Sequence, residues 1–391
     1  MRIGIAKPDY WFVGGYERYL DRLVDGIEAR GHEVGWMRVP VPGGAIDPFH
    51  LGLTEQQCLD VAELARFAWL VHEFRACDAS AFDIVLSTQP GSYAVQHPRH
   101  VSLFFHHHRI YYDLADLYVE AGFSPLELFG PAQAIVHRID AQLFEGVSLF
   151  LAGSATVDAR LQRFSPHPLP TASLRSTGLL DSFPTEQPRS GVLCVSRHEF
   201  PKRIELLVAA MKRLPDVVAT VIGDGSRLPW ARSVDARLSA PNVDLDGVDE
   251  RGLWVSRGLV TRPWRPPARS NVQFLLRVGV PVLRLAMASA VCVVAPAYDE
   301  DYGLTAIEAM AAATPVVVCD DGGGLVELVE DEVTGLIVEP TGAAIAAAVR
   351  RLVDDPDLAR RLGENGREVA RAHTLDAEVD SVLGGLEQVL G

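Results

Sequence analysis

Residues 291–310 read VCVVAPAYDEDYGLTAIEAM. The run Val291–Ala295 is apolar without alternation, a polar loop follows it, and small residues typical of a helix begin near Thr305. Apolar strands of this kind are buried on both faces of a sheet, and a helix directly after such a strand is typical of parallel α/β sheets. We therefore take this strand, loop and helix as the repeating unit of the fold.

Similar units occupy both halves of the 391-residue chain, which is long enough for two domains. Helices are expected at Tyr16–Arg30, from a Thr54/Gln57 capping box to about Phe74, and at Ile204–Leu214. The polar, proline-bearing residues 181–190 have no periodicity and predict a linker. The sequence thus predicts an α/β protein with two Rossmann-like, doubly wound domains facing across a cleft. The expected strands are Arg2–Ala6, Glu33–Val39, Asp83–Ser87, Val101–Phe105 and Ser148–Ala152, then Val192–Ser196, Val218–Gly223, Val291–Ala295, Val316–Cys319 and Leu336–Val338.

Composition excludes several classes of protein. Hydrophobic residues make up 48% and charged residues 22% of the chain, as in a well-packed globular protein. No apolar run reaches the roughly 18 residues of a membrane span, and residues 1–15 do not resemble a signal peptide, so we expect a cytoplasmic protein. The net charge of −15 disfavours general binding to nucleic acid, and the five scattered cysteines match no zinc or disulfide pattern.

Two glutamates, Glu300 and Glu308, flank Gly303 in the quoted stretch. The amides of Gly303, Leu304 and Thr305 would form a helix N-terminus, which favours phosphate. Together these groups suit a sugar nucleotide. Three simpler interpretations stay open: Thr305 and Glu308 could form a capping box, Glu300 could lie on the surface, and the run Asp299-Glu300-Asp301 could bind a divalent metal.

The second motif is VSRHEFPKR, residues 195–203. Arg197 follows a predicted buried strand, and Lys202 stands just before the next helix. Both are therefore expected at the carboxyl end of the second sheet, where ligands of such folds bind. A guanidinium and an ammonium there could neutralise a diphosphate, although either alone could be a solvated surface cation.

A dinucleotide-dependent dehydrogenase is the enzymatic alternative. Its G-x-G-x-x-G fingerprint is absent: the first domain has only Gly14-Gly15, and the second has Gly223-Asp224-Gly225 without the third glycine.

These motifs together resemble the family-4 retaining glycosyltransferases of the GT-B fold (glycosyl transferases group 1). The resemblance covers nearly the whole chain: Gly14-Gly15 and residues 30–34, Val221–Gly225, Glu300–Met310 and Thr314–Val317. It implies an acceptor-side domain over 1–182, a donor-binding domain over 183–372, and a terminal helix, 373–391, that returns to the first domain.

The resemblance also implies roles for single residues. Arg197 and Lys202 would bind the donor diphosphate, Glu300 the donor sugar and Glu308 the ribose, while Gly15 would let a loop approach the phosphates. The family has a histidine near the reacting sugar, and of His106, His107 and His108 the first fits best. A solvated polar turn is the alternative, and adjacent histidines cannot all reach one metal ion.

One segment departs from the family pattern. Residues 251–284 contain seven arginines and no acidic residue, in a chain with 36 basic and 51 acidic residues. The segment could be a functional basic loop, but an insertion or a shifted reading frame is favoured. Its prolines and lack of period predict that it is no part of the catalytic core, and that its middle can be deleted without loss of folding or nucleotide binding.

The expected function is transfer of a sugar from a nucleoside diphosphate sugar to a hydroxyl of a glycan, lipid or small molecule, with retention and without metal or other cofactor. A non-catalytic protein that binds sugar nucleotides or glycans is the alternative. The motifs leave the sugar, the base and the acceptor open.

Overall fold

The structure is a computed structural model of residues 1–391. It describes all of them except 11–14, 45–46, 124, 175–176, 179–181, 185–186, 261–264, 266 and 268–269. The chain divides into two compact units: unit 1 comprises Met1–Ser176 and Leu375–Gly391, and unit 2 comprises Thr177–Thr374. No helix among the described residues is both long and apolar enough to cross a membrane.

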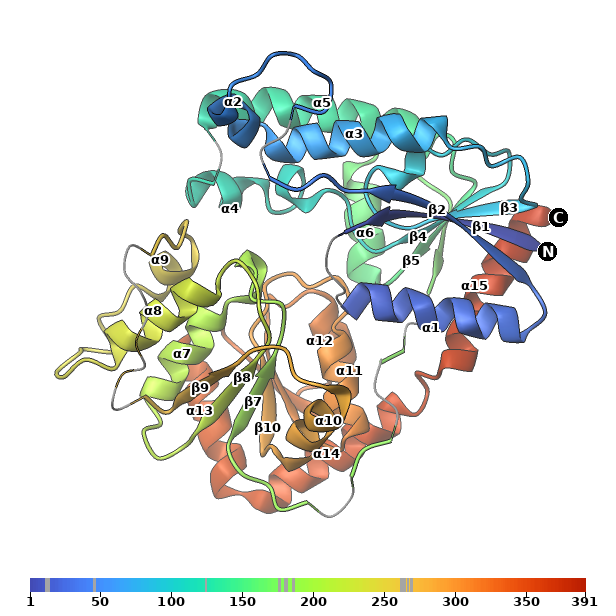
Figure 1. The fold of residues 1–391 in the computed structure, drawn as a ribbon. Helices are drawn as coiled ribbons and strands as arrows, with labels where there is room; N and C mark the ends of the chain where they lie inside the picture. The colour runs from blue at the N-terminus through green and yellow to red at the C-terminus, as the bar shows by residue number, and fades with distance from the viewer. Residues whose placement is uncertain are drawn as a thin grey trace. The chain divides into compact units, whose positions relative to one another are not determined.

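Unit 1 contains a six-stranded parallel sheet of order β2-β1-β3-β4-β5-β6. Helices α3 and α5 lie over one face of this sheet, and α1 and α15 lie on the other (Figure 1). The strands are β1 (Arg2–Asp9), β2 (Glu33–Pro40), β3 (Ile84–Ser87), β4 (His100–Phe104), β5 (Leu149–Ala152) and β6 (Thr171–Ser173). The helices are α1 (Gly15–Ala29), α2 (Glu55–Asp60), α3 (Ala62–Ala76), α4 (Ala115–Glu120), α5 (Leu126–Phe144), α6 (Ala155–Phe164) and α15 (Leu375–Leu390).

Unit 2 contains a second six-stranded parallel sheet, of order β12-β11-β10-β7-β8-β9. One apolar core joins this sheet to α7, α8 and α13, and another joins it to α10, α11 and α12. The strands are β7 (Val192–Val195), β8 (Ala219–Ile222), β9 (Val272–Leu275), β10 (Cys292–Ala295), β11 (Val316–Cys319) and β12 (Gly335–Val338). The helices are α7 (Ile204–Lys212), α8 (Leu228–Leu238), α9 (Glu250–Trp254), α10 (Val280–Ser289), α11 (Leu304–Ala311), α12 (Gly324–Leu328), α13 (Gly342–Asp354) and α14 (Pro356–Ala370).

The predicted fold class, two Rossmann-like α/β domains, is confirmed. The ten predicted strands are all present, with ends that differ by at most a few residues, and β6 and β9 are additional. Gly31 follows α1 with φ 83°, as expected of a glycine behind a helix end. The Thr54/Gln57 capping box is also present, but the helix behind it breaks at Val61 into α2 and α3.

The unit boundaries lie a few residues from the predicted 182/183 and 372/373. Of the predicted linker, 181–190, residues 181, 185 and 186 lie outside the described residues. The hydroxyl of Thr177 donates to the carbonyl of His373 at 2.5 Å, which joins the two ends of unit 2. Helix α15 packs against α1 within unit 1, where a Cβ at Gly26 would lie 2.6 Å from Val379.

The arginine-rich segment 251–284 is not the removable insertion that its composition predicts. It contains most of α9, the whole of β9 and the start of α10. Strand β9 pairs with β8 at the edge of the sheet, and the amide of Asn271 donates to the carbonyls of Met211, Leu214 and Val217 at 2.7–2.8 Å. The segment lacks a period because its ordered pieces are short, and an edge strand needs apolar residues on one face only.

Candidate functional site

The carboxyl ends of β7 and β8 are held together by a glycine turn. The amide of Ser196 donates to Ile222 O at 3.1 Å, and that of His198 donates to Asp224 O at 2.9 Å. A Cβ at Gly223 would lie 1.9 Å from the carbonyl oxygen of Ser196. Only glycine allows this close approach, so the glycine turn places the start of the Arg197 loop.

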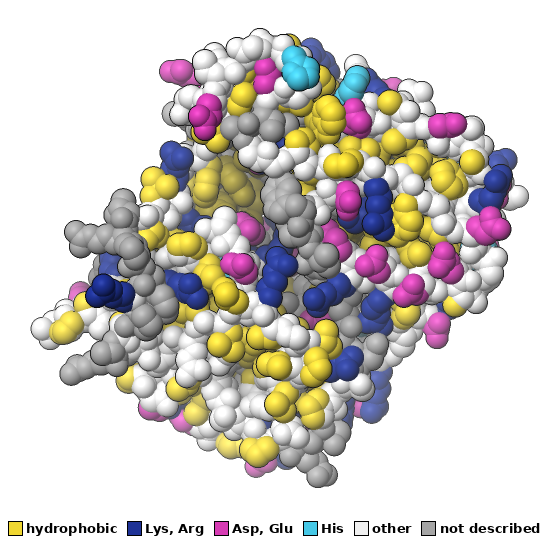
Figure 2. Space-filling model, in the orientation of Figure 1, with side chains coloured by type: hydrophobic (Ala, Val, Ile, Leu, Met, Phe, Trp, Pro, Cys, Tyr) yellow, Lys and Arg dark blue, Asp and Glu magenta, His cyan; other side chains and the backbone are white. Residues whose placement is uncertain are grey.

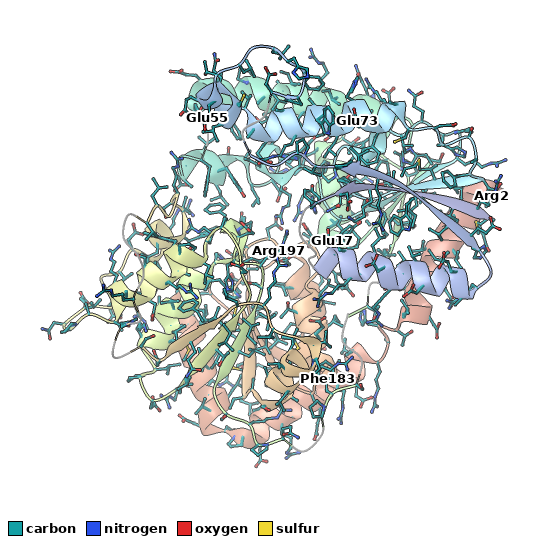
Figure 3. The ribbon with its side chains drawn as sticks, in the orientation of Figure 1. Arg2, Glu17, Glu55, Glu73, Phe183 and Arg197 are labelled. Carbon is teal, nitrogen blue, oxygen red and sulfur yellow. The ribbon has the colours of Figure 1, made fainter. Side chains whose placement is uncertain are left out.

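Arg197 and Lys202 both follow β7. Arg197 is exposed at the upper end of the sheet of unit 2 (Figure 3). Lys202 ends the 3₁₀ turn Phe200–Lys202, which directly precedes α7. Other lysine and arginine side chains are spread over the upper part of unit 2 on the face shown in Figure 2.

Strand order brings Glu300 to Lys202. Strand β10 is the neighbour of β7, so the loops that leave these two strands lie side by side. The amide of Tyr298 donates to Pro201 O at 2.8 Å, and the ammonium of Lys202 forms an ion pair with the carboxylate of Glu300. Their side chains are 23% and 18% exposed, so this pair is partly shielded from water. The structure thus joins two of the predicted site residues across 98 positions of sequence.

Helix α11 begins beside this ion pair. Gly303 is its N-cap with φ 107°, and a Cβ there would lie 2.7 Å from the side chain of Leu325. The hydroxyl of Thr305 donates to the carbonyl of Val195 at 3.3 Å, which ties the first turn of α11 to the end of β7. The amides of Gly303, Leu304 and Thr305 belong to the helix end whose N–H groups have no acceptor within the helix. Helix ends of this kind favour anions, and this one lies beside the end of β7, two residues before Arg197.

The capping-box interpretation of Glu308 is wrong. Thr305 is the second residue of α11 and caps nothing, because Gly303 occupies the N-cap position without a side-chain hydrogen bond. Glu308 is the fifth residue of α11, just beyond its first turn, and is 6% exposed. A Cβ at Gly178 would lie 3.1 Å from its Cγ. A buried glutamate beside a glycine is not explained by helix capping.

Sequence reasoning missed His198 and Arg203. The ring of His198 is fully buried between the β7 and β8 loops, and burial lowers its pKa to about 4, so it is neutral near pH 7. The guanidinium of Arg203 is also buried and forms a bidentate ion pair with Asp321. Both flank Arg197 and Lys202 in the sequence, but nothing in the motif distinguishes them from surface residues.

The predicted residues of unit 1 follow β4 and begin α1. His106 is partly exposed, with Nδ1 2.7 Å from the carbonyl oxygen of His107. The ring of His107 is buried and stacks on Tyr112 with centroids 4.2 Å apart. His108 lies 3.3 Å from the carboxylate of Glu63. The rings of His107 and His108 therefore contact other side chains of unit 1. Of the three histidines, His106 stays the predicted site residue.

Gly15 is the exposed first residue of α1, while Gly14 lies outside the described residues. No group of three or more histidine, cysteine, aspartate or glutamate side chains in the described part of the chain is arranged to hold a metal ion. Asp299 has φ 43° and its amide donates to Asp321 O at 2.8 Å, so the run Asp299–Asp301 is not an extended D-x-D strand.

Comparison with known proteins adds independent information. Residues 267–369 match the family model of glycosyl transferases group 1. The chain is similar to a D-inositol 3-phosphate glycosyltransferase of Kineococcus radiotolerans, 38% identical over 259 residues, which are 62% of this chain and 53% of the relative. It is also similar to a glycogen synthase of Mycobacterium tuberculosis, 27% identical over 262 residues, 64% of this chain and 56% of that one. The matches span about half the length of these relatives.

Among solved structures, the fold is similar to that of Anabaena HepE in complex with UDP and glucose. The TM-score is 0.65 at 18% identity, over 98% of this chain and 99% of HepE. This likeness concerns the fold, because 18% identity carries no function by itself.

Proposed function

We propose that this chain, whose residues 267–369 match the family model of glycosyl transferases group 1, transfers a sugar from a nucleoside diphosphate sugar to a hydroxyl acceptor, with retention of configuration and without a metal ion. The observation that carries the proposal is the meeting of Lys202, Glu300 and the N-terminus of α11 at one edge of the sheet of unit 2. An ammonium, a carboxylate and free helix amides there match the phosphates and hydroxyls of a sugar nucleotide.

Each group has a proposed task. Arg197, Lys202 and the amides of Gly303, Leu304 and Thr305 bind the diphosphate. Glu300 accepts hydrogen bonds from hydroxyls of the donor sugar, and Glu308 accepts them from the ribose. In unit 1, Gly15 lets the backbone approach the phosphates and His106 contacts the reacting sugar.

The chemical step breaks the bond between the anomeric carbon and the diphosphate oxygen through a transition state that resembles an oxocarbenium ion. Negative charge grows on the diphosphate as this bond breaks. Fixed cations and helix amides stabilise that charge more than they stabilise the bound donor, because they are oriented before the reaction starts. The acceptor hydroxyl attacks the same face of the sugar and loses its proton to the departing phosphate.

We propose the cytoplasm as the place of the reaction, which is compatible with the five cysteines being free thiols. The acceptor is a glycan, a lipid or a small molecule.

The test begins with thermal shifts against UDP-, GDP-, ADP- and dTDP-glucose, since a ligand of the native state raises Tm. The donor that binds is then assayed for release of its nucleoside diphosphate, with and without candidate acceptors.

Lys202→Ala and Arg197→Ala should each lower kcat more than they raise the donor KM, by about 2–4 kcal/mol of barrier. Binding without any release of diphosphate would instead favour a non-catalytic protein that binds sugar nucleotides.

A matched control is Arg189→Ala. Arg189 lies before β7, at the opposite end of the sheet, and donates to the carbonyls of Ala290 and Ala313 and to Thr314. Its loss should lower Tm while leaving kcat near the wild-type value. No shift with any of the four donors would contradict the proposed function.

A further inference from the structure

The turn that carries Lys202 is clamped by Arg203. The guanidinium of Arg203 donates to Pro296 O at 2.6 Å and to Ala297 O at 3.2 Å, and it pairs with both carboxylate oxygens of Asp321. Pro296 and Ala297 begin the loop that leads to Glu300, and Asp321 follows β11. One side chain next to Lys202 therefore holds the loops that leave β10 and β11.

Arg203 keeps this position in a backbone conformation that favours glycine. Its φ and ψ are 48° and 42°, in the left-handed region, and the residue is 1% exposed. A long charged side chain is rarely buried unless it is paired, and Arg203 is paired on every edge of its guanidinium fork. Because it is buried, Arg203 has no surface left for a ligand in solution and can affect one only through its neighbours.

Trp254 covers the same assembly from α9. Its indole N–H donates to Phe200 O at 2.8 Å, and its ring stacks on that of Phe200 with centroids 5.6 Å apart. The guanidinium carbon of Arg203 lies 5.0 Å from the centre of the Trp254 ring. The centres of the Trp254 and Tyr298 rings are 5.2 Å apart. Trp254 is 5% exposed and thus packs on both loops, the one with Lys202 and the one with Glu300.

We propose that Arg203 and Trp254 are positioning residues that fix Lys202 and Glu300 for binding of the donor diphosphate and sugar. The inference rests on the proposed function, and it assigns a task to the first part of the arginine-rich segment, α9, which carries Trp254. The Lys202 turn and the Glu300 loop are also joined directly, by the Tyr298–Pro201 hydrogen bond and by their own ion pair, and the clamp adds a second connection through Arg203 and Trp254. Small displacements of such groups are costly for catalysis.

A double-mutant cycle on ligand affinity tests this inference without knowledge of the acceptor. The probe is whichever of UDP, GDP, ADP and dTDP binds the wild-type protein most tightly, measured by calorimetry. The variants are Lys202→Ala, Arg203→Gly and the double variant. Glycine is chosen because it keeps the left-handed backbone while removing the guanidinium.

Arg203→Gly should weaken diphosphate binding about tenfold in the wild-type background, as expected when a charged hydrogen bond to the ligand is lost. In the Lys202→Ala background, Arg203→Gly should change the affinity by less than about twofold, because Arg203 acts on the ligand through Lys202. Effects of independent residues add to within about twofold, whereas effects of residues that depend on one another do not add. Equal losses in both backgrounds would show that Arg203 acts only on stability, and would overturn the inference.

Two further variants keep the test decisive. If Arg203→Gly does not fold, Trp254→Phe replaces it in the cycle, because phenylalanine keeps one aromatic ring and loses the indole N–H that donates to Phe200 O. Arg189→Ala should lower Tm but leave diphosphate affinity unchanged in either background. If the wild-type protein binds none of the four diphosphates, the proposed function fails and this inference fails with it. Binding by the wild type with an additive cycle contradicts the inference alone.

Discussion

The ammonium of Lys202 is already paired with a carboxylate before any donor binds. In the proposed function, a diphosphate competes with Glu300 for Lys202, and the donor sugar draws Glu300 towards its hydroxyls. Partly exposed ion pairs are worth about 0.2–1 kcal/mol, so this competition is modest.

For this reason Glu300→Gln should separate the two ligands. We expect a large fall in turnover of the sugar nucleotide, because the amide of glutamine accepts hydrogen bonds from sugar hydroxyls less well than the carboxylate does. Affinity for the free nucleoside diphosphate should stay level or rise, by up to about fivefold, since Lys202 is released. Calorimetry with the diphosphate and a turnover assay measure the two effects. Weaker binding of the diphosphate would show that Glu300 does not act on the sugar alone.

Glu308→Gln should behave differently. If Glu308 binds the ribose, affinity should fall alike for the free diphosphate and for the sugar nucleotide, by about 1.5–3 kcal/mol for a charged hydrogen bond. A nucleoside such as uridine should show the same loss, because the ribose is common to all three ligands. Wild-type affinity in a less stable Glu308→Gln protein would contradict the ribose contact and assign Glu308 a structural role.

At the level of elements, β9 shows how a short strand depends on contacts from its neighbours. Asn271 directly precedes the strand, and its side-chain NH2 group donates its two hydrogens among three carbonyl oxygens at the end of α7 and in the turn behind it. These contacts anchor the arginine-rich segment to the sheet.

Asn271→Ala should therefore lower the free energy of unfolding by about 2–3 kcal/mol, at roughly 1 kcal/mol for each hydrogen bond. The matched control is Gln273→Ala, which removes an amide from an exposed position of β9 and should change stability by less than about 0.5 kcal/mol. Urea unfolding of both variants measures the difference. Equal stability of the two variants would show that Asn271 does not anchor residues 251–284, and would support the prediction that this segment is a removable insertion.

Helix α5 carries a carboxyl group with an unusual pKa. Asp140 is 1% exposed, and burial raises its pKa from 3.8 to about 7, although the hydroxyl of Tyr112 donates to it at 2.8 Å and opposes the rise. A carboxyl whose pKa is higher in the folded state stabilises the protein fully below the unfolded pKa. This contribution is lost as pH rises through about 7.

Asp140→Asn should remove that loss. The free energy of unfolding of the variant, minus that of the wild type, should rise from pH 4 to pH 7 and stay constant above pH 7. The total rise should be a few kcal/mol, at about 1.4 kcal/mol for each pKa unit. Urea unfolding at pH 5 and at pH 8 measures the change. Asp116→Asn, an exposed carboxyl on α4, should show no such trend. Parallel profiles for wild type and Asp140→Asn would mean that Asp140 is ionised in the folded protein at pH 5.

For the whole molecule, the two units divide the proposed task. Unit 2 holds the charged groups for the diphosphate, and unit 1 holds His106 and Gly15. The proposed binding of the diphosphate can thus be tested through variants of unit 2, and we propose that acceptor choice depends on the loops of unit 1.

Donor binding and turnover by the full chain should survive EDTA. In the proposed site, Arg197, Lys202 and the amides of α11 would stabilise the charge of the diphosphate without a cation. Thermal shift and turnover are measured with and without the chelator. Loss of activity with EDTA and its return with Mg²⁺ or Mn²⁺ would instead point to Asp299 and Asp301 as metal ligands.

Local patterns in the sequence were sufficient to predict the repeating strands and helices. They also single out Arg197, Lys202, Glu300 and Glu308, whose roles stay predictions. Apolar runs, glycines and caps act over a few residues, and strand ends in parallel sheets collect ligand-binding groups on one edge. The same local patterns misjudged residues 251–284, because a short edge strand and a short helix have too few residues to show a period.

Only the tertiary structure decided which of these residues meet. Lys202 and Glu300 are 98 residues apart, and Arg203 and Asp321 are 118 apart. Their pairing follows from the order β12-β11-β10-β7 in the sheet. Strand order depends on how the strand–loop–helix repeats of one sheet pack against one another, and no short stretch of sequence encodes it. The burial of Arg203 beneath Trp254 has the same origin, since the hydrogen bond from Trp254 to Phe200 joins residues 54 positions apart in the sequence.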